Sequence, residues 1–401
     1  MATPAKAMEL MNDLRKSAYD VAVKEKQELA EFAKTKGHEG EIMAWDEGYY
    51  AELYRQEKLS FNEEDLRPYF PLPNVLKGMF GLAKRLFDID IEQVEPPPPT
   101  WNADVRFFEV KRDGKAVAYL YLDAYARPEE KRGGAWMDEC AARSKAMGGP
   151  DGVRLPVAHM VCNQSPPVGG KPSLMTLREV ETLFHEFGHA LQHMLTQQDY
   201  GLVSGVRGIP WDAVELPSQW AENWCYDKRT MDTLALHYET GEKIPIDLWN
   251  RLKEAKNYRA ASRLLRQLQF SVSDLTLHSE GVPSGSSPHD VYRKVAETYL
   301  VSQPLESDRF LCGFSHIFAG GYAAGYFSYK WAEVLSADAF SAFEEVGLDQ
   351  EDKVKETGAR FRDTVLAMGG GRDAAKVFED FRGRPPSPEA LLRHEGLLKV
   401  A

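Results

Sequence analysis

The feature that most constrains this chain is an amphipathic stretch at residues 176–195 that carries two histidines. Thr176 and Glu179 have the spacing of a helix capping box, and apolar residues then recur at helical intervals to the end of the stretch. This pattern predicts one helix over the whole stretch. His185 and His189 are four residues apart, so they project from one face of that helix, a single turn apart. This spacing lets two imidazoles bind one metal ion.

Glu186 stands between the two histidines in the sequence HEFGH. It points about 100° away from His185 around the helix axis, where its carboxylate reaches a metal-bound water more easily than the metal itself. The alternative is that the short pattern H-E-x-x-H arises by chance on a surface helix. Because two histidines alone do not distinguish a metal site from a chance match, a metal centre requires at least one further ligand.

A catalytic zinc ion keeps three protein ligands and one open position, so the helix must be searched for a third ligand. His193 lies two turns from His185, an axial rise of about 12 Å, which is too far for both to bind one ion. We expect His193 to support the site from outside or to lie on the surface. The longer motif with a third histidine on the same helix is absent, because the decisive positions are Gln192 and Leu195.

The remaining class of third ligand is a carboxylate from another helix. Glu215 follows His189 by 26 residues and precedes Pro217, which is suited to an early helical position. The residues after Pro217 continue helically. Glu215 is therefore expected at the start of a second helix, as a candidate ligand.

Composition and charge disfavour several classes of function. Lys and Arg number 49 against 61 Asp and Glu, and the net charge of −12 disfavours binding to nucleic acid or to an anionic membrane. No run of about 18 apolar residues is present, so no transmembrane helix is expected.

The first 20 residues lack a secretory apolar region and carry acidic residues, which predicts a cytoplasmic protein, or a chloroplast or mitochondrial one if a longer precursor exists. The four cysteines form no C-x-x-C pair and are expected to be buried thiols.

The order of predicted elements indicates a mainly helical protein with a small β-sheet, an α+β fold. Helices are expected over residues 4–35 and about 75–87. The proline run at 96–99 separates them from two apolar stretches around Asp113-Gly114, which predict a β-hairpin. A further strand is expected at 155–163, and the pattern after about residue 170 is helical almost to the end.

Several segments resemble the thimet oligopeptidase and oligopeptidase A family of zinc peptidases, in particular its plant and bacterial oligopeptidase A branch. They are HEFGHALQH, VELPSQ, RGGAWMDE, PVAHMVCNQ and FSHIFAGGYAAGYFSYKWAEVLSADAF, and the similarity extends from about residue 75 to the C-terminus. The resemblance implies a zincin-like catalytic core inside a helical body. It implies that His185, His189 and Glu215 bind one zinc ion. It also implies that Glu186 is the general base, which takes a proton from zinc-activated water and delivers it to the leaving amine.

Tyr322, Tyr326 and Tyr329 fall at i, i+4 and i+7 after two glycines, with His316 just upstream. The spacing predicts one face of a helix. From the residues alone, such a set is more often an aromatic stripe in the core. In the family that the chain resembles, the matching tyrosines line the cleft and bind substrate or the tetrahedral intermediate. The resemblance therefore implies that Tyr329 is the oxyanion donor, and that the other three residues contact the substrate.

Two further segments invite a functional interpretation. The strand that contains His159 and Met160 is expected to bind peptide backbone by edge addition, as an exposed strand can. His159 itself is expected to be structural. The charged segment ARPEEKR, residues 126–132, is expected to be a solvated loop and not a specificity element.

Together these expectations describe a helical lead segment at residues 1–95 and a zinc metallopeptidase catalytic domain at 96–401. The expected function is hydrolysis of internal peptide bonds of short oligopeptides by a zinc-dependent metalloendopeptidase. One alternative is a dipeptidyl carboxypeptidase of the same family. The other is a catalytically silent peptide-binding protein, since relatives have a longer N-terminal helical region. Oligopeptides are the expected partners, with neither nucleic acid nor membrane, and a monomer is favoured.

Overall fold

The computed structural model describes residues 3–148 and 152–398, which form two compact units. The first, here called the helical unit, comprises Met1–Asn62, Ile246–Val334 and Pro388–Ala401. The second, called the sheet unit, comprises Glu63–Pro245 and Leu335–Ser387. Each unit is thus assembled from segments that are far apart in the sequence. The lead segment expected at residues 1–95 contributes to both units, and its separation from a catalytic domain stays a prediction.

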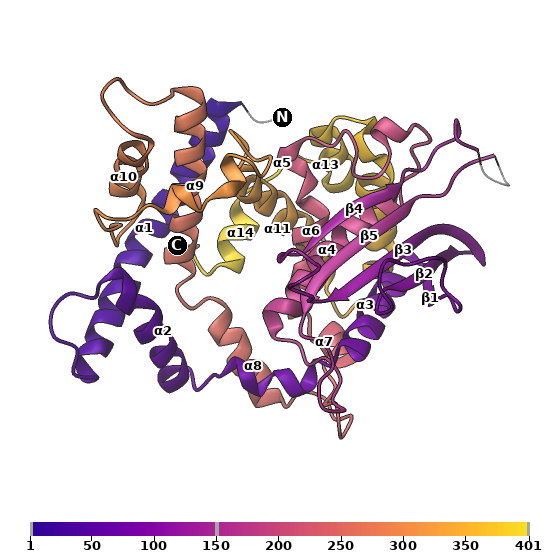
Figure 1. Ribbon diagram of the computed structural model, residues 1–401, viewed down its shortest axis with the longest axis horizontal. Coiled ribbons are helices and arrows are strands. Elements are labelled where there is room, and N and C mark those ends of the chain that lie inside the picture. Colours follow the sequence, from indigo (N-terminus) through magenta and orange to yellow (C-terminus); the bar gives the residue numbers. More distant parts are fainter. Residues whose placement is uncertain (1–2, 149–151, 399–401) are drawn as a thin grey trace. The chain divides into compact units, whose positions relative to one another are not determined.

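The helical unit is built around one central helix, α9 (Ala260–Ser279). Its other helices are α1 (Pro4–Thr35), α2 (Ala44–Lys58), α8 (Ile246–Lys256), α10 (Pro288–Tyr299) and α14 (Glu389–His394), and α11 (Ser328–Val346) begins in it. The helix expected at residues 4–35 is confirmed. α1 and α10 both pack along α9 (Figure 1). The carboxylate of Glu25 in α1 accepts the N–H groups of Ala261 and Ser262, at 3.1 and 2.8 Å, and so satisfies the first turn of α9.

The sheet unit combines a small sheet with helices. The helices are α3 (Leu72–Phe87), α4 (Leu177–Met194), α5 (Trp211–Val214), α6 (Leu216–Glu222), α7 (Lys228–Leu234), α12 (Glu351–Phe361) and α13 (Ala374–Arg382), with the later part of α11. The strands are β1 (Asp90–Gln93), β2 (Arg106–Arg112), β3 (Lys115–Tyr125), β4 (Trp136–Ala141) and β5 (Val157–Gln164). Their order in the sheet is β1-β2-β3-β5-β4. α4 packs against β3, β5 and β4, so the sheet supports the histidine helix (Figure 1).

The hairpin expected around Asp113-Gly114 is confirmed as β2 and β3. Both turn residues have positive φ, 51° for Asp113 and 73° for Gly114, which is what a tight two-residue hairpin turn requires. β3 and β5 pair in parallel, whereas the other strand pairs are antiparallel. The predicted fold class, mainly helical with a small sheet, is confirmed.

The expectation that the strand carrying His159 offers a free edge is wrong. This strand is β5, and it lies between β3 and β4 in the sheet. His159 pairs with Tyr121 on one side and Asp138 on the other. The edge on this side of the sheet belongs to β4, which the sequence analysis did not identify.

The charged segment at 126–132 is a loop, as expected, and Pro128, Glu129, Glu130 and Arg132 are exposed, but two of its cations are held by a buried carboxylate. The carboxylate of Asp123, only 2% exposed, accepts two hydrogen bonds from Arg127, at 2.8 and 2.7 Å, and one from Lys131 at 3.1 Å. Lys131 also donates to the carbonyl oxygen of Tyr125. The segment is therefore tied to the end of β3 by a buried carboxylate.

Two further expectations concern cysteines and membranes. All four cysteines are free, and Cys162 and Cys225 are buried as expected. Cys140 and Cys312 are exposed, which corrects the expectation for these two. Within the described residues, no helix has both the length and the apolar character needed to cross a membrane.

Candidate metal centre

Helix α4 presents the two histidines of the HEFGH sequence. Its start is fixed by the predicted capping box, in which Thr176 accepts the N–H of Glu179 and the Glu179 carboxylate accepts the N–H of Thr176. The apolar side of the helix is buried against the sheet. The side chains of His185 and His189 remain 23% and 14% exposed, so both imidazoles reach a partly open site.

Helix α6 brings Glu215 to the histidines, as expected from the sequence. Glu215 is the N-cap residue of α6, and Pro217 occupies its first turn. The two helices approach so closely at Gly188 that a Cβ atom there would lie 2.6 Å from Cα of Ser218, and closer still to the carbonyl oxygen of Pro217. Because Gly188 has no side chain, α4 and α6 can approach closely enough to bring the three candidate ligands together.

The three candidate ligands converge on one point. The Nε2 atoms of His185 and His189 lie 3.3 and 3.1 Å from Oε2 of Glu215. Two ligands of a tetrahedral zinc ion at 2.0–2.1 Å are about 3.3 Å apart, so these separations suit zinc. In residues 3–148 and 152–398, this is the one group of three or more His, Cys, Asp or Glu side chains found in a metal-binding arrangement.

A second carboxylate determines which nitrogen of His185 faces the site. Nδ1 of His185 lies 2.6 Å from Oε1 of Glu222, two turns beyond Glu215 in sequence. An ionised carboxylate only accepts hydrogen bonds, so Nδ1 carries a proton and Nε2 is the nitrogen that faces Glu215. Burial acts to lower the pKa of His185, but hydrogen bonds to Glu215 and Glu222 outweigh it and hold this pKa well above its usual range. Without a metal ion the imidazolium therefore donates to both carboxylates, and as a neutral ring His185 has Nε2 directed to a metal ion beside Glu215.

The carboxyl groups of Glu186 and Glu215 differ in their tendency to ionise. Burial raises the pKa of Glu186, which is 6% exposed. Burial also acts to raise the pKa of Glu215, but hydrogen bonds from His185 and His189 outweigh it and hold this pKa well below its usual range. The hydroxyl of Ser218 donates to Oε2 of Glu215 at 2.9 Å. Glu215 is thus an ionised, oriented candidate ligand, whereas the raised pKa of Glu186 suits it to exchange a proton.

His193 is neither a ligand nor a surface residue. It is fully buried, and its Nε2 lies 3.0 Å from the carbonyl oxygen of Ala141, at the end of β4. Gly205 packs directly on its ring. The expectation of a surface position is wrong, because His193 fixes the last turn of α4 to the edge strand.

His316, Tyr322, Tyr326 and Tyr329, here called the aromatic group, lie in the helical unit. Contrary to expectation, Tyr322 and Tyr326 are not on a helix: Tyr322 lies in an irregular stretch and Tyr326 in a turn, and only Tyr329 lies in α11. Ala324 has a φ of 56°, and the N–H groups of Ala324 and Tyr326 donate to the carboxylate of Asp274 instead of to helical carbonyl groups. This long-range bond interrupts the helix.

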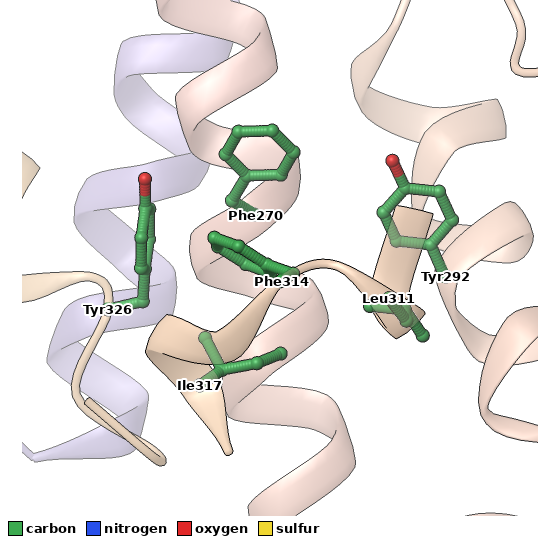
Figure 2. Packing of buried hydrophobic residues seen from close by; sticks show 6 residues of the cluster. All are labelled: Phe270, Tyr292, Leu311, Phe314, Ile317 and Tyr326. Atoms are coloured by element: carbon green, nitrogen blue, oxygen red, sulfur yellow. The ribbon is translucent and has the colours of Figure 1, made fainter. Parts of the chain in front are cut away.

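The turns nevertheless bring the predicted rings together. The Tyr329 ring stacks on Tyr322 with centroids 4.8 Å apart and meets Tyr326 edge-on at 5.2 Å. The exposed His316 lies 6.3 Å from Tyr322 and 6.1 Å from Tyr326, between ring centroids. Tyr326 is only 8% exposed and packs beside Phe314, as Figure 2 shows. The roles of these four residues in substrate binding stay predictions.

The structure therefore contains two groups of candidate residues. The candidate metal ligands and Glu186 belong to the sheet unit, and the aromatic group belongs to the helical unit. The contributions of Glu222 and Gly188 to the candidate site were not predicted from the sequence. Glu222 had a readable signal, because it follows Glu215 by seven residues and so shares its helix face.

Comparison with known proteins assigns the family. The model of peptidase family M3 matches residues 1–397. Organellar oligopeptidase A, chloroplastic/mitochondrial, from Arabidopsis thaliana is 60% identical, over 100% of this chain and 51% of that protein. Probable cytosolic oligopeptidase A from the same plant is 57% identical, over 100% of this chain and 58% of that protein.

A solved structure supports the fold. The M32 carboxypeptidase from Deinococcus radiodurans R1 has a TM-score of 0.54 at 13% identity, and the match covers 99% of this chain and 67% of that one. The chain spans little more than half the length of the two plant relatives. The resemblance deduced from the sequence motifs is thereby confirmed, and the chain belongs to peptidase family M3.

Proposed function

We propose that this chain binds one zinc ion through His185, His189 and Glu215, and that it hydrolyses internal peptide bonds of short oligopeptides. The observation that carries the proposal is the convergence of two imidazole nitrogens on one carboxylate oxygen at 3.3 and 3.1 Å. The family, and the names of the two plant relatives, support peptides as the substrate class.

A bound zinc ion supplies Lewis acidity, which makes water more acidic and polarises a carbonyl group. In this proposal the chain's own groups move the proton. Glu186 accepts a proton from the attacking water and then delivers it to the leaving amine. Because burial raises the pKa of Glu186, the carboxyl group retains the proton between these two transfers more readily than an exposed one would.

The aromatic group of the helical unit supplies the remaining roles. Tyr329 donates a hydrogen bond to the oxygen on which negative charge develops. His316 and Tyr322 contact the peptide. Tyr326 also contacts it in this proposal, although its small exposed area makes support of the Tyr329 ring its larger contribution.

The proposal is tested with the purified chain and a short, internally quenched peptide. Hydrolysis should stop after chelation and return when zinc is added back, and it should be absent in zinc-loaded Glu186→Gln. Masses of the products show whether internal bonds are cut. A zinc-loaded chain that binds the peptide without cleaving it would instead support the silent peptide-binding alternative.

A further inference from the structure

A buried carboxylate of the helical unit holds the turns that carry the aromatic group. Asp274 in α9 is completely buried. Its Oδ1 accepts the N–H of Ala324 at 2.9 Å, and its Oδ2 accepts the N–H of Tyr326 at 2.8 Å. Nδ1 of His278, one turn along α9, lies 2.8 Å from Oδ1. Three donors thus converge on a single buried carboxylate and satisfy both of its oxygens.

These hydrogen bonds maintain a backbone conformation that the segment would not adopt alone. Ala324 has a φ of 56°, a left-handed conformation that is unfavourable for a residue with a Cβ atom. The Asp274 carboxylate matches the two amide groups that this turn exposes. The turn is therefore fixed from α9 in addition to its local backbone hydrogen bond from Gly325 N–H to the carbonyl oxygen of Tyr322, at 2.9 Å.

Tyr326 is held at both its backbone and its side chain. Its N–H donates to Asp274, and its hydroxyl donates to Oε1 of Gln267, also in α9, at 3.0 Å. Its ring meets Phe314 and Phe270 with centroids 5.0 and 5.8 Å apart (Figure 2). The ring of Tyr329 rests against this fixed ring. A change at Asp274 is thus transmitted through Tyr326 to Tyr329.

We propose that Asp274 is a positioning residue, which holds the turn at Ala324 and Tyr326 so that Tyr329 is placed for its reaction. His278 assists by donating to the same carboxylate. This inference rests on the proposed function of Tyr329 and adds to it the residue through which the helical unit controls that tyrosine.

The test is a double-mutant cycle between Asp274→Asn and Tyr329→Phe, with kcat/KM for the quenched peptide as the readout. Asparagine has nearly the same size, but one acceptor becomes a donor that faces a backbone N–H. Asp274→Asn should lower kcat/KM at least about 10-fold in the chain with Tyr329 and less than about 3-fold in the chain with phenylalanine there. Zinc content should be unchanged in all four proteins.

Asp373→Asn is the matched control. Asp373 also accepts two backbone N–H groups, from Ala375 and Lys376, but it caps α13 in the sheet unit. This variant should keep kcat/KM within about 2-fold of the unmodified chain, since asparagine caps helices as well as aspartate does. A merely structural Asp274 would lower stability and reduce kcat/KM by the same factor with and without the Tyr329 hydroxyl, which would overturn the inference.

Two further results of these experiments bear on the inference. If Tyr329→Phe alone leaves kcat/KM unchanged, the proposed role of Tyr329 fails, and the inference about Asp274 fails with it. If Asp274→Asn does not fold, the cycle is run with His278→Ala, whose side chain is 28% exposed. A loss of about 3-fold or more that disappears in the Tyr329→Phe background supports the inference. A kcat/KM equal to that of the unmodified chain overturns it.

Discussion

Gly188→Ala inserts a methyl group between α4 and α6. The added Cβ atom would lie 2.6 Å from Cα of Ser218, whereas ordinary contacts of this kind begin at 3.4 Å. The obstacle is backbone, which cannot rotate away as a side chain does. The two helices therefore have to separate by about 0.8 Å at this point, or more where the carbonyl oxygen of Pro217 is approached.

This separation is large on the scale of a metal site. Zinc–ligand distances are maintained within about 0.2 Å, so moving Glu215 away from His185 and His189 by several times that amount weakens binding. We predict zinc affinity at least about 10²-fold lower, beyond the range seen when groups that merely orient ligands are removed. Overpacking should also reduce stability by about 1–3 kcal/mol, less the gain of about 1 kcal/mol from alanine in a helix.

The assay is competition for zinc with a chelator of known affinity, together with thermal unfolding. Gly81→Ala is the matched control, because Gly81 lies in α3 of the same unit and an added Cβ atom there meets nothing within 4 Å. The control should be more stable by about 1 kcal/mol and bind zinc normally. Normal zinc affinity in Gly188→Ala would refute the argument that this close contact assembles the site.

The remaining predictions address single groups. Glu186→Gln should keep its zinc but lower kcat at least about 10²-fold, and near-normal turnover of the zinc-loaded variant would exclude the general-base role. Glu222→Ala should weaken zinc affinity by about 10- to 100-fold, as measured by chelator competition, because His185 loses its orienting acceptor. Tyr329→Phe should cost about 3 kcal/mol of transition-state stabilisation with little change in KM, whereas a raised KM at constant kcat would make Tyr329 an ordinary binding residue. A peptide with an amidated C-terminus should be cleaved as well as the free acid, and its rejection would favour the dipeptidyl carboxypeptidase alternative.

Local patterns predicted the part of the site that depends on neighbouring residues. The capping box at Thr176 and the four-residue spacing of His185 and His189 are properties of one helix, so the sequence contains them completely. The position of Glu215 at a helix start could be predicted from Pro217 for the same reason. That Glu215 meets the histidines could not, because it depends on the contact that Gly188 permits between two helices.

Errors arose where a distant group competes with a local pattern. The spacing of Tyr322, Tyr326 and Tyr329 is helical, yet Asp274, about 50 residues earlier, captures the amide groups that a helix would use. His193 is a polar residue for which a surface position was an expected alternative, but its Nε2 lies 3.0 Å from the carbonyl oxygen of Ala141, 52 residues earlier. In both cases the decisive partner lies far away in the sequence.

Elements without a clear apolar pattern were missed. β4 has the sequence WMDECA, in which apolar and polar residues do not alternate, and none of its side chains is buried, so it lacks the sequence pattern that identifies a strand. α2 likewise has no buried residue. The edge position of β4 explains its composition, and without β4 the neighbouring strand was assigned the free edge.

The central claim is that three side chains hold one zinc ion, and its most direct test is a crystal structure of the zinc-loaded chain with anomalous scattering measured at the zinc absorption edge. We predict a single strong peak within about 2.0–2.2 Å of Nε2 of His185, Nε2 of His189 and a carboxylate oxygen of Glu215. The peak should vanish in Glu215→Ala crystals grown with the same zinc concentration. A peak elsewhere, or one that keeps its strength at this position without Glu215, would contradict the account.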